Sequence, residues 1–352
     1  FGPYDWGRYD LLVLPPSFPY GGMENPRLSF ITPSLLAGDR SLVAVVAHEL
    51  AHSWSGNLVT IATWRDGWLT EGVTSYLESR LMEVIYDKDR VDEEGVLSYE
   101  ELLLDFEQVS PAMQALAPRL DSGDPDDFQG TIHYHKGQLF LQYLENAFGR
   151  PTFDRFLFGY FKDFAFQTIT TERFLDYLDE QLLSVPGATV NRRQAEQWTY
   201  ESGLPDDAPV PRSATLDAAA QMAGAWAAGE LDVDEVPVAE WSPQALIHFI
   251  NSVPQDIDND RLGELDAAFG LSDTNNAEIA RTWFIQVASR RYTTAYPQLE
   301  AHLARHGRGR LIAPVFAALI NNGVDKELAQ AIFGRVRGNY HPLVDAAIAR
   351  TL

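Results

Sequence analysis

The pattern of apolar positions predicts a short β part followed by a long series of helices. Residues 9–14 and 28–32 are compact apolar runs, and two prolines end the first of them. Such runs bounded by turn residues are typical of strands. From Ser41 onward, apolar residues recur every three or four positions, which is typical of helices. We therefore expect a mostly α protein with a small β part.

Two stretches interrupt the helical pattern. Residues 87–130 are acidic and show no clear period, so we expect them to be irregular. Residues 202–212 are rich in proline, which is typical of a linker. Beyond them every apolar pattern is helical, and successive helices joined by short turns are typical of an α-solenoid. We expect helices over 71–86, 138–148, 153–164, 171–183, 213–228, 242–252, 259–269, 275–289, 292–306, 309–321, 325–337 and 341–350.

Composition and charge exclude several classes of partner. The 352 residues include 50 acids and 27 basic residues, which gives a net charge of −23. Such a surface repels nucleic acid and anionic membranes, and no apolar run approaches the roughly 18 residues of a membrane span. The chain has no cysteine, so histidines and carboxylates must hold any metal. The sequence begins without a methionine, so we take it as the remainder of a longer product. We also expect a cytoplasmic protein.

The sequence His48-Glu49-Leu50-Ala51-His52 carries the strongest chemical signal. Residues four apart on a helix share one face, so His48 and His52 offer two imidazoles to a single point. We expect Asp39 or Ser41 to cap this helix and Gly56-Asn57 to end it. An amphipathic helix with two satisfied histidines is the alternative.

A third ligand and a base complete a zinc site. A catalytic zinc takes three protein ligands and keeps one open position. Glu71, on the next predicted helix, is the expected third ligand, and Glu49 is the expected general base. Glu78 is two turns from Glu71 on the same face and is a candidate to orient a metal-binding histidine. A surface acid is the alternative for Glu78.

Two further features are ambiguous from the residues alone. Gly21-Gly22 allows another backbone to approach closely, with Glu24 held just after it. A tight turn and a solvated acid are the alternatives. His302 and His306 also have metal-ligand spacing, but they stand at a helix end without a third ligand or a base, so we expect them to be structural.

These motifs together resemble the gluzincin zinc aminopeptidases, in particular the group that includes leukotriene A(4) hydrolase and its bacterial relatives. The resemblance implies a thermolysin-like zinc metallopeptidase catalytic domain followed by an α-helical, armadillo-like domain. We expect the catalytic domain over 1–201, a linker over 202–212 and the helical domain over 213–352. The stretches that carry the resemblance are Tyr9–Pro26, His48–Thr60, Thr63–Gly72, Tyr134–Gly137, Ser202–Pro205 and Gly307–Arg310.

The resemblance also implies roles for individual residues. His48, His52 and Glu71 would hold one zinc ion per chain, while Glu49 would accept a proton from the attacking water. Tyr134 would donate a hydrogen bond to the tetrahedral intermediate. The remaining roles concern the substrate, a short peptide with a free N-terminus: Gly21 and Gly22 would hold its backbone, Glu24 its α-amine, Asp126 an N-terminal Arg side chain, and Arg308 and Arg310 its carboxylate end.

The chain departs from this family in four ways. Gln129 replaces a tyrosine, and Gly67 replaces a bulky aromatic residue that lines a lipid channel in the leukotriene hydrolase. His133 and His135 flank Tyr134 where the family commonly has proline and glutamate. We also expect this sequence to lack the family's N-terminal β domain, which would pack on the catalytic domain in the full-length protein, together with the opening of the catalytic domain.

Three functions compete. The leading one is a zinc aminopeptidase that removes the N-terminal residue from short peptides. The first rival also opens lipid epoxides, as a leukotriene A(4) hydrolase does. The second is an inert binding scaffold with structural zinc, which is disfavoured because Glu49 and Tyr134 are retained although neither is needed to hold the metal.

Overall fold

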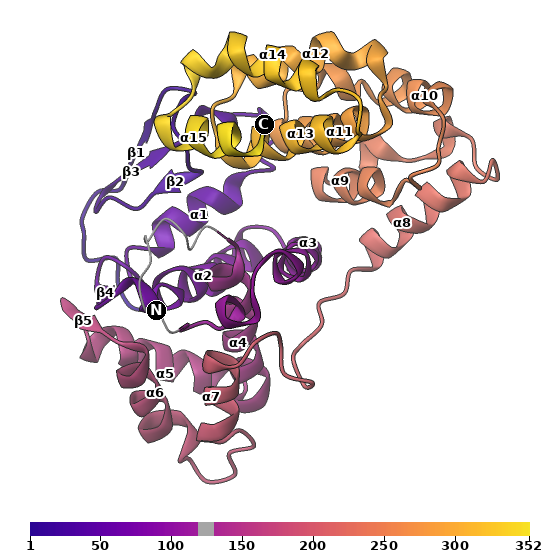
Figure 1. The fold of residues 1–352 in the computed structure, drawn as a ribbon. Coiled ribbons are helices and arrows are strands. Elements are labelled where there is room, and N and C mark those ends of the chain that lie inside the picture. Colours follow the sequence, from indigo (N-terminus) through magenta and orange to yellow (C-terminus); the bar gives the residue numbers. More distant parts are fainter. Residues whose placement is uncertain (119–129) are drawn as a thin grey trace. The chain divides into compact units, whose positions relative to one another are not determined.

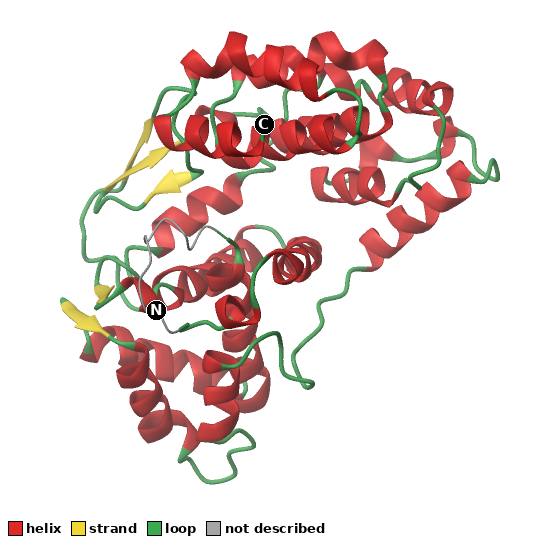
Figure 2. Ribbon diagram, in the orientation of Figure 1, coloured by secondary structure: helices red, strands yellow, loops and turns green. Residues whose placement is uncertain are grey.

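The computed structural model describes residues 1–118 and 130–352, and these residues are mostly helical with a few short strands (Figures 1 and 2). This confirms the expected mostly α class. No helix in the described part of the chain is long and apolar enough to cross a membrane. The structure divides into two units, each with a hydrophobic core of its own. The first unit consists of residues 1–10, 24–29 and 46–212, and the second of residues 11–23, 30–45 and 213–352.

Short strands form two small sheets. Strands β1 (Asp10–Val13), β2 (Gly22–Met23) and β3 (Leu28–Ile31) lie in the order β1-β3-β2, and β2 runs antiparallel to β3. The two apolar runs near the start of the chain therefore form strands, as expected. Strands β4 (Val59–Ile61) and β5 (Gln167–Ile169) pair in parallel. The sheets are minor parts of a helical protein.

Helices of the first unit pack around large aromatic side chains. Trp68, Phe140, Phe153 and Trp198 are fully buried in this core. Large aromatic residues dominate core energetics because each removes much apolar surface from water. The helices up to the proline-rich stretch are α1 (Val43–Ala51), α2 (Trp68–Ile85), α3 (Lys88–Gln108), α4 (Ile132–Phe148), α5 (Arg150–Asp163), α6 (Thr171–Leu178) and α7 (Arg192–Tyr200).

Helix α3 corrects one expectation from the sequence. Residues 87–130 were expected to be irregular, which is wrong for the 21 residues of α3. Asp87 caps this helix by accepting a hydrogen bond from the backbone N–H of Arg90, and Arg90 pairs with Glu94 one turn later at 2.9 Å. Only a narrow side of α3 is buried, including Leu102. Acidic residues therefore interrupt the regular spacing of apolar residues along α3. Capping and side-chain pairs one turn apart stabilise this helix instead.

Helices of the second unit form two layers. Figure 1 shows α9, α11, α13 and α15 side by side in one layer, with α10, α12 and α14 in the other. This alternation is what an α-solenoid requires, because each helix pair buries its apolar face against the next pair. The bounds agree with the expected segments to within a few residues: α8 (Ala214–Ala227), α9 (Pro243–Ser252), α10 (Asn259–Phe269), α11 (Ala277–Arg290), α12 (Tyr296–Arg305), α13 (Gly309–Asn321), α14 (Lys326–Val336) and α15 (Pro342–Thr351).

Helices α2 and α4 of the first unit make a very close contact at two glycines. A Cβ atom on Gly72 of α2 would lie 2.7 Å from the Cα of Gly137 of α4 and 2.7 Å from the carbonyl oxygen of His133. A Cβ atom on Gly137 would likewise lie 2.7 Å from the Cα of Gly72. The two backbones therefore touch, and no larger residue fits at either position without moving a helix.

We expect Gly137→Ala to destabilise the first unit, because the new methyl group must push α4 away from α2. Overpacking of this kind costs about 1–3 kcal/mol. The measurement is the free energy of unfolding in urea, followed by circular dichroism. Gly95→Ala on α3 is the matched control, since its Cβ would meet Pro211 at an ordinary 3.5 Å. The control should be neutral or stabilising by up to about 1 kcal/mol. Equal effects of the two substitutions would contradict the close contact.

Candidate metal centre

Helix α1 presents two histidines with helical spacing. His48 lies in its last turn and His52 directly follows its end, but His52 still donates a backbone hydrogen bond to the His48 carbonyl at 3.1 Å. The two ring centroids are 4.7 Å apart. The expected end of this helix at Gly56-Asn57 is wrong, because α1 ends at Ala51 and turns follow it. His48 and His52 still lie on one face, because the helical hydrogen bond from the His52 N–H to the His48 carbonyl forms one residue beyond the end of α1.

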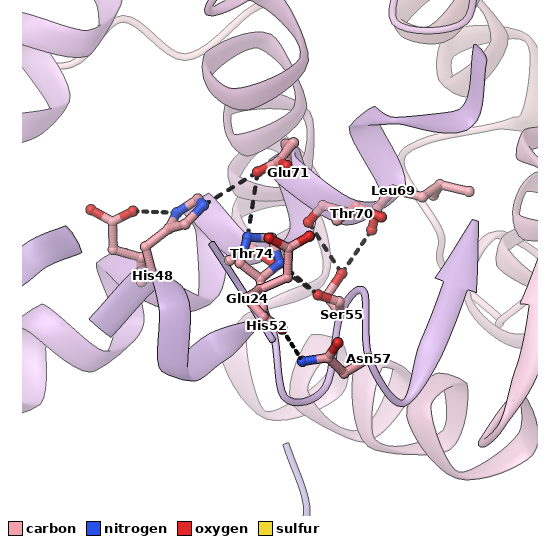
Figure 3. Close-up of polar contacts among 10 residues, drawn as sticks. Glu24, His48, His52, Ser55, Asn57, Leu69, Thr70, Glu71 and Thr74 are labelled. Carbon is pink, nitrogen blue, oxygen red and sulfur yellow. Dashed lines mark hydrogen bonds and ion pairs between the residues drawn. The ribbon is translucent and has the colours of Figure 1, made fainter. Parts of the chain in front are cut away.

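Glu71 completes the group from the first turn of α2. Its Oε2 atom lies 3.2 Å from Nε2 of His48 and 3.5 Å from Nε2 of His52 (Figure 3). All three ligand atoms lie within 4.8 Å of one another. The start of α2 is fixed by the buried Asp66, whose carboxylate accepts hydrogen bonds from the backbone and hydroxyl groups of Thr63 and Thr171.

The Nδ1 atom of each imidazole contacts a hydrogen-bond acceptor. Nδ1 of His48 lies 2.9 Å from a carboxylate oxygen of Glu78, and Nδ1 of His52 lies 2.9 Å from the carbonyl oxygen of Ser55. The hydroxyl of Thr74 contacts both Nδ1 of His52, at 3.1 Å, and the Ser55 carbonyl, at 3.2 Å. Because a carboxylate and a carbonyl only accept, both Nδ1 atoms carry the proton. Both Nε2 atoms are thereby turned towards Glu71, on the side where each would bind a metal in place of its proton.

The charges of these groups are strongly coupled. Burial alone would raise the pKa of Glu71, but His52 and His48 outweigh it and hold that pKa well below its usual range. Burial would lower the pKa of His48, whereas Glu71 and Glu78 outweigh it and raise that pKa. Two imidazole nitrogens and one carboxylate oxygen are the donors of a catalytic zinc site. The residues therefore fit a zinc ion.

Glu49 and Glu24 form a second acidic group beside His52. Glu49 is 5% exposed, and its Oε2 atom has no hydrogen-bond partner among the residues that the structure describes. Burial raises the pKa of Glu49 to about 7. Glu24 brings a carboxylate oxygen within 4.8 Å of ligand atoms of Glu49 and His52. Asn57 holds the backbone at Glu24 by donating to its carbonyl at 2.8 Å (Figure 3).

Tyr134 reaches the same centre from the first turn of α4. Its ring stacks on that of His48, with the centroids 5.8 Å apart and the planes at 23°. Burial raises the pKa of Tyr134, and the carboxylates of Glu71, Glu24 and Glu49 raise it further. The phenol therefore keeps its proton and acts as a hydrogen-bond donor.

The two unexplained histidines next to Tyr134 have distinct surroundings. A Cβ atom on Gly67 would lie 3.1 Å from Nδ1 of His133, so the His133 ring takes the space beside Gly67. His135 points to α3, where its Nε2 atom lies 3.6 Å from a carboxylate oxygen of Glu101. The His133 imidazole therefore fits in this chain because position 67 has no side chain.

Other residues with expected roles lie in the second unit. A Cβ atom on Gly21 would lie only 2.7 Å from a terminal guanidinium nitrogen of Arg308. Gly22 pairs with Ile31 in the small sheet. His302 is buried, and its Nε2 atom contacts the Leu311 carbonyl at 3.2 Å. The positions of Asp126 and Gln129 lie outside the described residues.

The fold and the site agree with the comparison to known protein families. Residues 1–198 match the peptidase family M1 domain, and residues 241–352 match the leukotriene A4 hydrolase C-terminal domain. The chain belongs to peptidase family M1. This confirms the expected resemblance, and zinc is the metal that membership of this family implies.

Several M1 relatives match almost the entire chain. Leucine aminopeptidase 2 of Chaetomium globosum is 34% identical over 364 residues, which cover 99% of this chain and 58% of the relative. Aminopeptidase B of Rattus norvegicus is 33% identical over 364 residues, which cover 97% and 55%. The structure of yeast LTA4 hydrolase in complex with Bestatin superimposes with a TM-score of 0.87 and 32% identity, covering 99% of this chain and 60% of the yeast chain. This match confirms a catalytic domain followed by a helical domain. The chain spans well under two thirds of the length of these relatives.

Sequence reasoning missed Thr74 and Ser55, which support His52. Thr74 follows Glu71 by three residues on α2, and Ser55 follows His52 by three. Spacings of three place side chains near one another on a helix or turn, so this signal was present in the sequence. A three-residue spacing is too common to single out these two residues, because most threonines and serines at such spacings have no role at a metal centre.

We expect Thr74→Val to weaken zinc binding, because it removes the hydroxyl that contacts both Nδ1 of His52 and the Ser55 carbonyl. Loss of such supporting contacts typically costs about 10- to 100-fold in metal affinity. Competition with a chromophoric chelator measures this without any turnover. Thr199→Val is the control, since the buried Thr199 hydroxyl donates to the Ala195 carbonyl one turn earlier on α7. An unchanged zinc affinity in Thr74→Val would contradict the supporting role.

Proposed function

We propose that this chain carries the catalytic machinery of a zinc-dependent aminopeptidase, which removes the N-terminal residue from short peptides. The observation that carries the proposal is the meeting of two imidazole nitrogens and the Glu71 carboxylate, with the carboxylate of Glu49 buried beside them. A purely structural zinc site needs no buried base next to it. The names of the curated M1 relatives, leucine aminopeptidase and aminopeptidase B, support the same reaction class.

His48, His52 and Glu71 would hold one zinc ion. When bound, zinc acts as a Lewis acid and lowers the pKa of water in its open position from about 15.7 towards 7. Glu49 accepts the proton of the attacking water and passes it to the leaving amine. Because burial raises its pKa to about 7, Glu49 is suited to both steps at neutral pH.

Tyr134 stabilises the charge that develops during the attack. Its protonated hydroxyl donates a hydrogen bond to the former carbonyl oxygen as that oxygen becomes negative. The stacking of Tyr134 on His48 supports this role, because it holds the phenol beside the metal ligands. Fixed donors of this kind are typically worth about 100- to 1000-fold in turnover.

Glu24 would bind the free α-amine of the substrate. A carboxylate that pairs with the free α-amine fixes the distance from the chain end to the scissile bond, which makes the reaction an exopeptidase reaction. Gly21 and Gly22 would hold the peptide backbone, and Asp126 would favour an N-terminal Arg. Arg308 and Arg310 would receive the carboxylate end.

The catalytic domain would extend over 1–201 and the helical domain over 213–352, with the N-terminal β domain packing on the catalytic domain in the full-length protein.

We expect Glu49→Gln to retain zinc but to lose turnover of arginyl-4-nitroanilide by a factor of about 1000, because the glutamine amide cannot accept the proton. A chelator should abolish wild-type turnover, and added zinc should restore it. Zinc content measured on the same samples separates loss of the base from loss of the metal. Turnover that persists in the presence of the chelator, or full turnover by Glu49→Gln, would contradict the proposed zinc-dependent aminopeptidase reaction.

We expect Glu24→Gln to reduce kcat/KM for peptides with a free N-terminus by about 100-fold, because the ammonium loses its charged partner. The wild-type protein should scarcely cleave the same peptides after N-acetylation. The ratio of the two rates is the measurement, and it should fall towards one in the variant. Equal wild-type rates on free and acetylated peptides would show that Glu24 does not select the chain end.

A further inference from the structure

Asn57 connects a metal ligand to the segment that carries Glu24. Its backbone N–H donates to the His52 carbonyl at 3.0 Å. Its side-chain amide nitrogen donates to the Glu24 carbonyl at 2.8 Å (Figure 3). All three residues belong to the first unit. One residue therefore bonds the main chain of an expected zinc ligand on one side and the main chain of the expected amine-binding residue on the other.

The turn that carries Asn57 is itself held in place. The hydroxyl of Ser55 donates to the Leu69 carbonyl, just before the metal-binding part of α2, at 2.7 Å. Gly56 has a φ of 113°, which glycine adopts without strain, and a Cβ atom there would lie 3.1 Å from Nδ1 of His52. The turn therefore packs directly on the His52 ring and has little room to shift relative to it.

Glu24, by contrast, lies just beyond regular structure. Strand β2 ends at Met23, and residues 24–27 connect it to β3. The Glu24 carboxylate has an oxygen within 4.8 Å of ligand atoms of Glu49 and His52. Two carboxylates this close repel each other when both are charged. The bond from Asn57 opposes a displacement of Glu24, and because it holds the main chain it does not occupy the carboxylate.

An anchor for an α-amine works only at a fixed distance from the reacting bond. The amine and the scissile carbonyl of one residue must reach Glu24 and the metal centre at the same time, and a displacement of about 1 Å can cost about 100-fold in rate. The two contacts of Asn57, to His52 and to Glu24, fix this distance.

We propose that Asn57 is a positioning residue that sets the distance between the Glu24 carboxylate and the metal centre, so that the chain accepts a free α-amine one residue from the scissile bond. This inference rests on the function proposed above, in which Glu24 binds the α-amine. Asn57 acts through Glu24 and not on the reacting atoms. Metal binding does not depend on the Asn57 side chain, because the bond to His52 comes from the Asn57 backbone.

The test is turnover of arginyl-4-nitroanilide and of its N-acetyl derivative by Asn57→Leu. Leucine keeps the branched shape of asparagine but has no hydrogen-bond donor. We expect kcat/KM for the free amine to fall about tenfold, because Glu24 loses its fixed position. The slow turnover of the N-acetyl derivative, which has no ammonium to pair with Glu24, should not change. Zinc affinity, measured with a chromophoric chelator, should also stay the same.

A double-substitution cycle shows whether Asn57 acts through Glu24. In the Glu24→Gln background, Asn57→Leu should lower kcat/KM for the free amine by less than about a further twofold, because residues that act together are not additive. Gln167→Met is the matched control, since the Gln167 amide nitrogen donates to the Asp163 carbonyl at 2.9 Å at an exposed position of the same unit. Its loss should leave both rates unchanged.

A second variant and a binding measurement complete the test. If circular dichroism shows that Asn57→Leu does not fold, Asn57→Ser takes its place, because the shorter side chain does not reach the Glu24 carbonyl and the same loss is expected. Calorimetry gives a readout without turnover. In the Glu49→Gln background, argininamide should bind about tenfold more weakly after the change at Asn57, whereas binding of N-acetylargininamide should not change.

Three results would overturn the positioning role and leave zinc-dependent hydrolysis in place: equal losses on the free and acetylated substrates, full additivity with Glu24→Gln, or an unchanged preference for the free amine in the Asn57 variants. Weaker zinc binding by Asn57→Leu would assign Asn57 to the metal centre instead, and would overturn it as well. A wild-type chain that does not prefer the free amine would overturn the α-amine role of Glu24, and this inference with it.

Discussion

The structure depends on the burial of three ionisable side chains in one place. His48, His52 and Glu71 are removed from most of the solvent, and each charge is tolerated because the others and their supporting groups compensate for it. An isolated buried charge would cost several kcal/mol, and removal of one partner exposes the others to that cost. A zinc ion at this point would be held by His48, His52 and Glu71 in place of the protons that these groups share, which is why the arrangement suits zinc.

The backbone contact between α2 and α4 serves the same requirement. α2 carries Glu71 and α4 carries Tyr134, and each functional residue lies within three positions of a contacting glycine, Gly72 or Gly137. Two helices with ordinary side chains at their crossing stand about 8–10 Å apart. Glycine at both positions lets the backbones touch, so the tyrosine and the carboxylate reach one centre. In the sequence these glycines look like minor parts of larger motifs, and only the packing shows why they are needed.

The features that depend on local spacing could be predicted from the sequence. The helical turn between His48 and His52 is a local property, and so are the apolar periods of the eight C-terminal helices. α3 could not be predicted in the same way, because its stability comes from caps and side-chain pairs that do not change the apolar pattern. The supporting contacts of Thr74 and the ion pair between Glu278 and Arg308 join residues far apart in the sequence. The pattern of one sequence does not single out such pairs, since threonines, acids and arginines at similar spacings are common everywhere.

Gly21 shows how a sequence motif and its structure can explain the same residue differently. A pair of glycines before an acidic residue suggests a backbone that a peptide can approach, and that interpretation needs a ligand. In the folded chain the space over Gly21 is already needed by Arg308, whose guanidinium would collide with any larger residue there. Exchange of Gly21 for alanine would therefore displace an arginine even in the absence of a peptide. The two explanations are compatible, because both depend on the lack of a side chain at Gly21. Packing of Arg308 against Gly21 therefore explains the small residue at this position without a ligand, and the approach of a peptide backbone stays a proposal.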